Sequence, residues 1–579
     1  MSIVILREHF FYLRLVPRRK QPLRKPLHIS ALHICCSLLW LWSLSSCQDT
    51  TQAEEGLLTG GRHAGNEAFS RWQGEILEEA AENRGRSGDS LRLTEYSILR
   101  SLQDASPGSR YWSMDENWKV SGDSLISFIE GAEAYGLFPS EYQLKAIRAQ
   151  RRLLEDSLAR EDESNWAKAE LLMTDAFVHL SRHLKMGRLQ RDSITLRSDS
   201  LYTADHIAGL LNRVSAGESV RSVLESEEPV HPGYRSLRQS LPALLDSLNL
   251  KPYTYLSYPQ KDSLAFIRQL QKRLSEDKYL PAKSGLPDSL TLSNAIRKAQ
   301  LAKKLKADGK PGPALVNALN NTGYDKFIRI AMNLDRYKHL PSAMPDRYIW
   351  VNIPSYSLQL FDSGKVKLES KIIVGTAENR TPVLNSSIRN IVVYPQWNVP
   401  YSIVFKEMLP QIQRSTGYLK RKNLVVVDRR GRVVDPSGIQ WSKLGPTNFP
   451  YGIRQLEGDN NSLGVMKFNF PNKYAVYLHD TNARGLFSRG KRSLSHGCVR
   501  VQNWQELAAE MLVADSLSVS ADSLKAVLGR REQRSFMLQA PTPIYLRYFT
   551  AYAADGRIRF LEDIYAEDRL LREKYFTRR

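Results

Sequence analysis

The chain has 579 residues, of which 42% are hydrophobic and 25% are charged, so about three or four globular domains are expected, and wholesale disorder or a fibrous repeat is excluded. The one long apolar stretch, Ala31 to Ser43, is shorter than the ~20 residues of a membrane-spanning helix, which excludes a polytopic membrane protein. The formal net charge of +21 favours an anionic partner such as a membrane surface or an acidic wall polymer, whereas nucleic acid is disfavoured because no zinc-ligand spacing, basic-region heptad or aromatic RNA-binding signature is present.

The amino terminus has the pattern of an export signal. Residues 1–46 combine a basic region, the apolar stretch and then small residues, which predicts a secretory signal peptide. The end of this segment, Leu44-Ser45-Ser46-Cys47, resembles a bacterial lipobox, in which the cysteine is lipidated and becomes the first residue. We therefore expect an exported lipoprotein of the periplasm or cell envelope, with a membrane anchor at Cys47 and a tether or partly helical spacer over 47–88. The alternative is an ordinary signal peptide that is cleaved elsewhere.

The cysteine content points to one thiol. Of the four cysteines, Cys35 and Cys36 lie in the predicted signal peptide and Cys47 is the predicted lipidation site. The mature chain then keeps Cys498, so an exported protein of this kind is not held together by disulfides. Cys498 is either a buried apolar residue or a reactive group.

Residues 89–255 are predicted to form a helical scaffold, because apolar residues such as Leu172, Phe177 and Leu184 recur at helical spacing. Two segments, 88–91 and 122–125, spell the GDSL signature of a serine hydrolase family. However, Asp-Ser-Leu occurs nine times in the chain, and a catalytic serine does not recur in this way. Asp and Ser ahead of an apolar run are typical of helix starts, which we prefer to the hydrolase interpretation.

Residues 256–322 contain two helical stripes, a turn at Asp308-Gly309 and a short last helix. With Leu270-Gln271-x-x-Leu274 and Asp-Gly-x-x-Gly, this order resembles the small three-helix peptidoglycan-binding domain. The alternative is a structural helical insert without glycan binding.

From residue 346 the pattern changes to strands. Alternating residues over 348–353 precede a hairpin of 357–361 and 366–374, and a second hairpin is expected over 424–427 and 432–434. A helix returns over 504–512. The fold class is therefore multidomain α+β, with a mainly β catalytic domain over 346–579 after the helical scaffold and the three-helix domain.

The residues that carry chemistry lie between Tyr477 and Arg500. Within this stretch are His479, at the end of an apolar run, and the sequence Ser495-His496-Gly497-Cys498. A thiol needs a nearby base to react at neutral pH, and an imidazole is able to act first as base and then as acid to a leaving amine. Glycine allows close backbone approach, and adjacent amides are able to stabilise an oxyanion. A metal site and a merely buried cysteine are the alternatives.

The spacing His-x(15)-Ser-His-Gly-Cys, followed by Val499-Arg500, resembles the active-site signature of the L,D-transpeptidases. Outer segments, including 395–400, 467–472 and 541–548, resemble larger members of this family. The resemblance implies Cys498 as nucleophile and His479 as general acid/base. It also implies that Ser495, His496, Gly497 and Arg500 support the nucleophile loop, the oxyanion site or a substrate carboxylate. Residues 397–469 are expected to form a lid over the site.

The function implied by this resemblance is cross-linking of peptidoglycan stem peptides at their third residues through a cysteine thioester, in cell wall biogenesis and maintenance of cell shape. The expected partners are peptidoglycan and a membrane, and no cofactor or metal is needed. The alternatives are a carboxypeptidase or endopeptidase that uses the same thioester and a lipoprotein that tethers the membrane to the wall.

Overall fold

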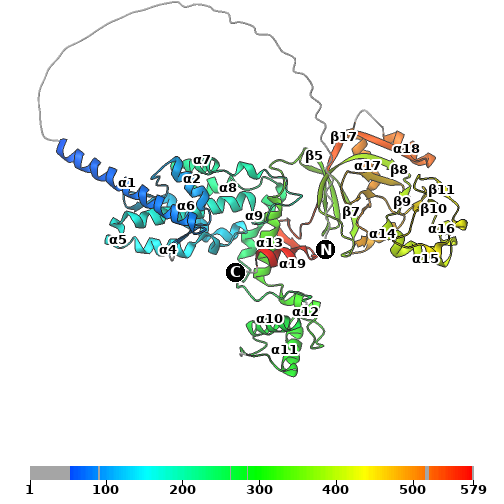
Figure 1. Ribbon diagram of the computed structural model, residues 1–579, viewed down its shortest axis with the longest axis horizontal. Coiled ribbons are helices and arrows are strands. Elements are labelled where there is room, and N and C mark those ends of the chain that lie inside the picture. The colour runs from blue at the N-terminus through cyan, green and yellow to red at the C-terminus, as the bar shows by residue number, and fades with distance from the viewer. Residues whose placement is uncertain (1–51, 89–90, 261, 283–284, 516–520, 577–579) are drawn as a thin grey trace, which may run out of the picture. The chain divides into compact units, whose positions relative to one another are not determined.

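The computed structural model describes residues 52–88, 91–260, 262–282, 285–515 and 521–576 (Figure 1). The predicted signal peptide and Cys47 lie outside these residues. None of the described helices combines the length and the apolar character that crossing a bilayer requires.

The first part of the described chain is helical, as predicted. Its helices are α1 (Gln52–Glu82), α2 (Tyr96–Ala105), α3 (Val120–Glu130), α4 (Leu144–Leu153), α5 (Ser157–Glu161), α6 (Glu163–Met186), α7 (Ala204–Ser215), α8 (Val220–Glu225) and α9 (Pro232–Leu245), with short turns of 3₁₀ helix η1 (Ala132–Tyr135), η2 (Pro139–Tyr142) and η3 (Asp199–Leu201). Two-residue strands pair as β1 (Arg86–Ser87) with β2 (Leu91–Arg92) and β3 (Ser113–Met114) with β4 (Asn117–Trp118).

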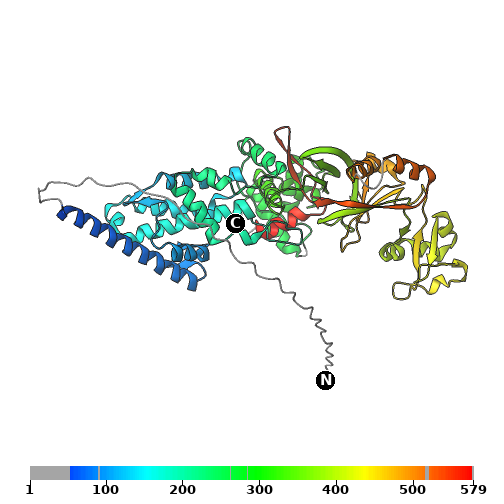
Figure 2. The same ribbon diagram turned by 90° about the horizontal axis from the view of Figure 1, so that it is seen from above.

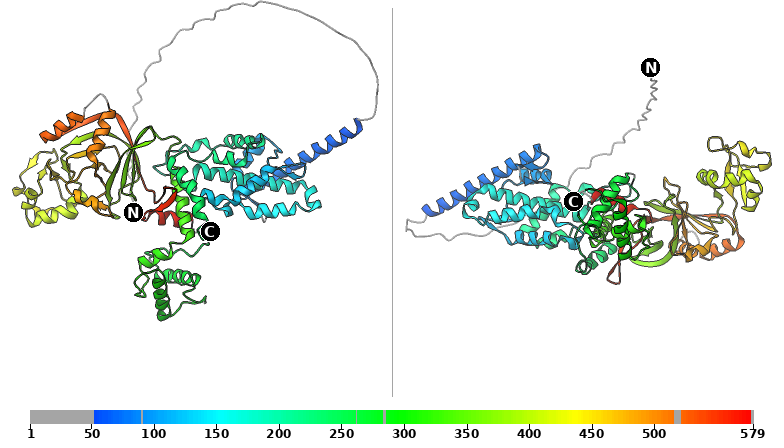
Figure 3. Two further views of the ribbon diagram at one scale, coloured as in Figure 1. Left: turned by 180° about the vertical axis from the view of Figure 1, so that it is seen from behind. Right: turned by 90° about the horizontal axis from the view of Figure 1, so that it is seen from below.

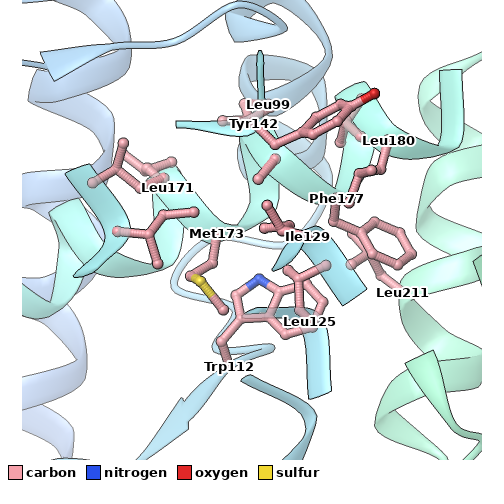
Figure 4. Packing of buried hydrophobic residues seen from close by; sticks show 14 of the residues in the cluster. Leu99, Trp112, Leu125, Ile129, Tyr142, Leu171, Met173, Phe177, Leu180 and Leu211 are labelled. Atoms are coloured by element: carbon pink, nitrogen blue, oxygen red, sulfur yellow. The ribbon is translucent and has the colours of Figure 1, made fainter. Parts of the chain in front are cut away.

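Helix α6 is buried on nearly all its faces and forms the centre of this scaffold. Its Met173 and Phe177 pack beside Leu125 and Trp112, with the rings of Trp112 and Phe177 5.5 Å apart (Figure 4). A tether or partly helical spacer was expected over 47–88. The segment is helical in α1, but Phe69 and Leu77 on this helix are fully buried in the same core, so this part packs as scaffold and not as a free tether.

The repeated Asp-Ser-Leu segments are used in two ways. Asp156, Asp262 and Asp288 cap the amino termini of α5, α10 and α11 through their side chains, as predicted. Asp246, in contrast, is the residue at the carboxyl end of α9, and Asp123 lies inside α3. Asp-Ser-Leu therefore begins a helix at some positions and lies inside or at the end of a helix at others.

The three-helix segment consists of α10 (Ser263–Glu276), α11 (Ser289–Ala302) and α12 (Pro313–Leu319), which share one apolar core. Gln300 holds the predicted turn, since its amide donates to Asp308 and its carbonyl accepts from the Gly309 N–H.

Helix α13 (Gly323–Tyr337) connects this segment to the β-rich part and contacts α19 (Glu567–Tyr575), as Figure 3 shows in green and red. At its end Asp335 is almost completely buried, and its carboxylate accepts from Lys338 Nζ at 2.9 Å and from the Arg188 backbone N–H at 3.0 Å.

The β-rich part is a nine-stranded sheet in the order β15-β7-β16-β14-β13-β8-β17-β5-β6, and β6 also pairs with β7, which closes eight of the strands into a ring. The strands are β5 (Arg347–Asn352), β6 (Ser357–Asp362), β7 (Lys365–Gly375), β8 (Leu384–Val393), β13 (Met466–Asn469), β14 (Leu478–His479), β15 (Ser493–Ser495), β16 (Val499–Val501) and β17 (Arg534–Arg547). The sheet is accompanied by η7 (Arg484–Ser488), α17 (Trp504–Ala514), α18 (Ala521–Arg530), and the hairpin β18 (Ala551–Ala554) and β19 (Arg557–Phe560). Both predicted hairpins and the helix after residue 504 are confirmed.

The inserted segment forms a small sheet of its own, in the order β11-β10-β12-β9, with a separate apolar core (yellow in Figure 2). Its elements are β9 (Trp397–Asn398), α14 (Tyr401–Ile403), the π-helical turn η4 (Val404–Met408), α15 (Leu409–Arg414), α16 (Gly417–Arg421), β10 (Leu424–Val427), β11 (Val433–Val434), η5 (Pro436–Gly438), η6 (Trp441–Lys443) and β12 (Gly452–Gln455). Residues 466–469, which we included in the predicted lid, belong instead to the main sheet as β13.

The buried carboxylate of Asp335 gives a stability prediction. Asp335→Ala leaves the Lys338 ammonium buried without its partner, so we expect the free energy of unfolding to fall by about 3–5 kcal/mol. Urea unfolding followed by circular dichroism measures this. The matched control is Asp104→Ala, which removes an exposed ion pair with Arg100 and should cost at most about 1 kcal/mol. Equal effects of the two substitutions would contradict the prediction.

Candidate active site

The register of three neighbouring strands builds the site. Lys467 on β13 pairs with His479 on β14, and His479 pairs in parallel with Arg500 on β16. Paired residues on adjacent strands point to the same face of a sheet, so these three side chains form a row. The next residues along, Leu478 and Val499, are fully buried on the opposite face. The same parallel pairing sets Tyr477 and Cys498 side by side at the end of the row, where the Val499 N–H donates to the Tyr477 carbonyl at 3.1 Å.

The loop that carries Cys498 is held by hydroxyl groups on both sides. Ser495 Oγ donates to the Cys498 carbonyl at 2.6 Å and accepts from the Gly497 N–H at 3.1 Å. Thr381 Oγ1 donates to the Gly497 carbonyl at 2.7 Å. Gly497 has a φ of 114°, a conformation that L side chains rarely adopt, which explains glycine before the nucleophile. Ser495 therefore fixes the loop that presents the thiol.

The thiol of Cys498 is partly exposed, and Sγ lies 3.9 Å from the Ala475 carbonyl oxygen. Burial raises the pKa of this thiol, while hydrogen bonds from the backbone and side chain of Tyr477 and the charges of Lys467 and Arg500 act in the opposite direction. Because burial is the larger effect, the thiol is protonated at neutral pH. The neighbouring groups are nevertheless arranged to stabilise a thiolate when one forms.

The imidazole of His479 is kept neutral. Burial, together with the charge of Arg500, lowers the pKa of His479 to about 3, although the backbone groups of Asp480 and Leu463 oppose the shift. Its Nδ1 is buried and has no partner within normal hydrogen-bond geometry. The ring lies 5.6 Å from the ring of Tyr477. A neutral imidazole is the form of histidine that is able to accept a proton from a thiol.

Neither cation of the row is neutralised. Among the described residues, no carboxylate lies within ion-pair distance of Lys467 or Arg500. The Lys467 ammonium instead lies 4.1 Å from the centre of the Tyr477 ring, and the Nε of Arg500 is buried without a hydrogen-bond partner. Burial lowers the pKa of both groups. The face that carries the Cys498 thiol is therefore suited to an anionic ligand.

The remaining predicted site residue is placed differently. His496 is exposed, and its Nε2 lies 2.5 Å from a carboxylate oxygen of Glu407 on η4 of the inserted segment. It therefore connects the nucleophile loop to the lid. Trp397 and Phe405 pack against the lid's own core, whereas Tyr401 is largely exposed and stacks on Phe405 with ring centres 5.7 Å apart.

Three parts of the chain match models of known protein families. Residues 346–519 match the family model of the L,D-transpeptidase catalytic domain, 99–241 match that of a scaffold domain, and 263–319 match that of a "Putative peptidoglycan binding domain". Residues 346–519 are thus similar to the catalytic domain of the L,D-transpeptidases. These matches fall inside the predicted segments 89–255, 256–322 and 346–579. The resemblance to a large L,D-transpeptidase with a scaffold is confirmed.

A curated relative from Haemophilus influenzae, named "Putative L,D-transpeptidase", is 40% identical over 241 residues, which are 42% of this chain and 48% of the relative. The chain thus aligns with about half the length of that protein. The catalytic domain of the Enterococcus faecium L,D-transpeptidase acylated by ertapenem is 14% identical, covers 35% of this chain and 99% of that one, and has a TM-score of 0.17. The L,D-transpeptidase from Stackebrandtia nassauensis is 13% identical, with 51% and 97% covered and a TM-score of 0.15. Scores this low add nothing to the fold assignment.

Asp480, Thr381 and Lys467 lie near the site but were not among the predicted site residues, although Lys467 belongs to a segment that resembles larger family members. Asp480 is completely buried behind His479, where it accepts from the Val465 N–H at 3.0 Å and pairs with Arg484 at 2.8 Å. Lys467 reaches the site from β13 and Thr381 from the loop between β7 and β8, so only the long-range fold brings them there. Asp480 directly follows the predicted base in the sequence. No group of three or more metal-ligating side chains occurs among the residues described.

The protonation states give a testable pH dependence. Because burial raises the thiol pKa, the rate of Cys498 alkylation by iodoacetamide should keep rising above about pH 8.5, the ordinary pKa of a thiol. A thiolate–imidazolium pair would instead give a rate that levels off near neutral pH. Mass spectrometry of the Cys498 peptide follows the reaction. His479→Ala should change the rate at pH 7 by less than about threefold, whereas loss of an ion pair would lower it by about tenfold or more.

Proposed function

We propose that this protein is a peptidoglycan L,D-transpeptidase that joins the third residues of two stem peptides through a thioester on Cys498. The observation that supports this most directly is the parallel pairing of β14 with β16 in a domain that matches the L,D-transpeptidase model: the buried, neutral His479 ends β14, and Cys498 immediately precedes β16. The proposed role is in cell wall biogenesis and cell shape.

In the first half of the proposed reaction, Cys498 Sγ attacks the carbonyl carbon of the third residue of a tetrapeptide stem, which is joined by an amide to the terminal D-Ala. The thiol proton passes to His479, and the amide bond to the terminal D-Ala breaks. His479 then returns the proton to the departing D-Ala nitrogen, and a thioester remains. Amides near Gly497 are proposed to stabilise the oxyanion of the tetrahedral intermediate.

In the second half, a side-chain amine of a neighbouring stem attacks the thioester carbonyl. His479 takes a proton from this amine, a new amide forms, and the proton returns to the Cys498 sulfur as the thiol leaves. Water in place of the amine would give a carboxypeptidase or endopeptidase reaction. The lid is proposed to favour the amine, and the His496 contact with Glu407 ties it to the nucleophile loop.

Lys467 and Arg500 are proposed to receive carboxylates of the donor stem. Each is largely buried, has no acidic partner among the residues described, and lies on the same face as the thiol. A stem peptide carries free carboxylates, so its binding would neutralise this positive charge. The same two cations would stabilise the thiolate that develops during attack.

The protein is proposed to work in the cell envelope. The match to a peptidoglycan-binding model over 263–319 supports an enzyme that is held at its polymeric substrate. We further propose the signal peptide over 1–46, a lipid anchor on Cys47 and a periplasmic location. A thiol and an imidazole suffice for the chemistry, so no cofactor is included.

Mass spectrometry of products tests the activity. Incubation of the mature protein with disaccharide-tetrapeptide should give a dimer that is lighter than two monomers by one D-Ala, and Cys498→Ala should give none. Ser488→Ala, at the exposed end of η7, is the control and should keep full activity. Tripeptide and free D-Ala without dimer would support the hydrolase instead. No Cys498-dependent product would favour the tethering lipoprotein.

The role of Lys467 has its own test. Lys467→Met removes a charge-assisted contact, so we expect kcat/KM for the tetrapeptide to fall by about 10–100-fold, with a further rise in the pKa of Cys498. The matched control is Lys473→Met, which removes an exposed ammonium that lies 5.2 Å from the Tyr474 ring. An equal effect of both substitutions, measured by steady-state kinetics, would rule out a specific role for Lys467.

A further inference from the structure

A second cavity lies outside the active site and contains none of the residues described there. It has a volume of about 460 Å³ and is lined by residues 189–194, the end of α13, the end of β17 and α19. Arg547 and His339 are buried at its floor, while Arg191, Arg380 and Lys574 are exposed at its rim. Cationic groups from four separate segments therefore converge on one space.

The buried guanidinium of Arg547 is the most informative group in this cavity. The residue is 4% exposed, and it donates to the carbonyl oxygens of Leu384 at 3.1 Å and Leu546 at 3.2 Å and to the side chain of Asn385. All three acceptors are neutral, and no carboxylate of the described chain lies within ion-pair distance of it. Burial lowers the pKa of Arg547 to about 10. Asp192 acts on this charge only from beyond ion-pair distance, so the buried guanidinium has no directly paired counterion, which a buried charge normally has.

The residues that line the cavity also carry an excess of positive charge. Five arginine and lysine side chains face only two carboxylates, those of Asp192 and Glu567. One of the five, Arg336, is already paired with Asp568 at 2.7 Å, so it does not account for the excess. Burial also raises the pKa of Glu567, while the charges of Arg336 and Arg380 act in the opposite direction. The remaining excess suits a ligand with two negative charges better than one with a single charge.

Much of the rest of the lining is apolar, although Gln190, Tyr548 and Tyr575 also contribute polar groups. Leu189, Val383 and Leu571 contribute aliphatic surface beside the basic groups, and Phe549 contributes an aromatic one. A bare inorganic ion would leave this surface in contact with water, whereas an organic body attached to the anion would cover it. Since the cations approach from several directions, a tetrahedral group fits better than a planar carboxylate, whose oxygens lie in one plane.

We propose that this cavity binds a phosphate monoester with an apolar body. The phosphate would pair with Arg547 at the floor and with Arg380 and Lys574 at the rim, and the organic body would lie against the aliphatic wall. This inference does not depend on the proposed transpeptidase activity, because no residue of the catalytic site lines the cavity.

Isothermal titration calorimetry on the mature protein, in low-salt buffer without phosphate, tests the proposal. The probes are hexyl phosphate, inorganic phosphate, hexanoate and adipate. Hexyl phosphate should bind at least about tenfold more tightly than each of the other three, because it alone combines the tetrahedral dianion with the apolar body. Equal affinity for hexanoate, or tighter binding of adipate, would overturn the phosphate assignment. Equal affinity for inorganic phosphate would show that the apolar body does not contribute to binding, and would overturn that part of the proposal.

Two sets of variants locate the binding. The rim pair Arg380→Gln with Lys574→Gln should weaken hexyl phosphate binding by about tenfold or more. The control pair Arg429→Gln with Lys443→Gln removes the same charge from exposed positions of the inserted segment and should leave affinity within about twofold. Equal loss in both pairs would indicate attraction by net charge alone and overturn the site. Arg547→Lys, checked for folding by circular dichroism, should also weaken binding, and unchanged affinity in a folded variant would count against the proposal.

Discussion

The positive charge that the strand register places on one face of the main sheet is the constraint on which the active site depends. Lys467, His479 and Arg500 are neighbours only because β13, β14 and β16 pair in this register, and a shift by one residue would send all three toward the apolar core. Burial and the two neighbouring cations lower the pKa of His479, so its imidazole is neutral at neutral pH. Its neutrality is therefore a property of the sheet.

This arrangement separates the resting state from the reacting state. At rest, burial favours the uncharged thiol and the uncharged imidazole, so the pair carries no charge that needs a partner. When a proton moves, the sulfur becomes negative next to Lys467, Arg500 and Tyr477. The stabilising groups are already in position, which avoids the cost of reorganising them during the reaction. The enzyme chemistry that we propose uses this preorganisation.

Local sequence patterns predicted the helical scaffold, the hairpin of β6 and β7, and the stretch from Tyr477 to Arg500, because helix periodicity and strand alternation act over a few residues. The closed ring of strands could not be predicted, since it depends on pairs such as β17 with β8, which are far apart in the chain. For the same reason Lys467 and Thr381 were not identified as site residues. The burial of Phe69 in the scaffold was also missed, because its helix has a polar composition and only weak amphipathic character.

The position of β15 at the end of the strand order has a consequence for motion. The ring is closed by the pairing of β6 with β7, and it keeps all its strand pairs without β15. The segment that leads to Cys498 is attached to β7 and its continuation by a few bonds, among them Val374 N–H to the Arg492 carbonyl and Thr376 N–H to the Ser495 carbonyl, each at 3.0 Å. Breaking them opens the loop locally while the domain stays folded. Hydrogen exchange in this loop is thereby uncoupled from global unfolding, and the strand that leads into the nucleophile loop is the one that is least costly to displace.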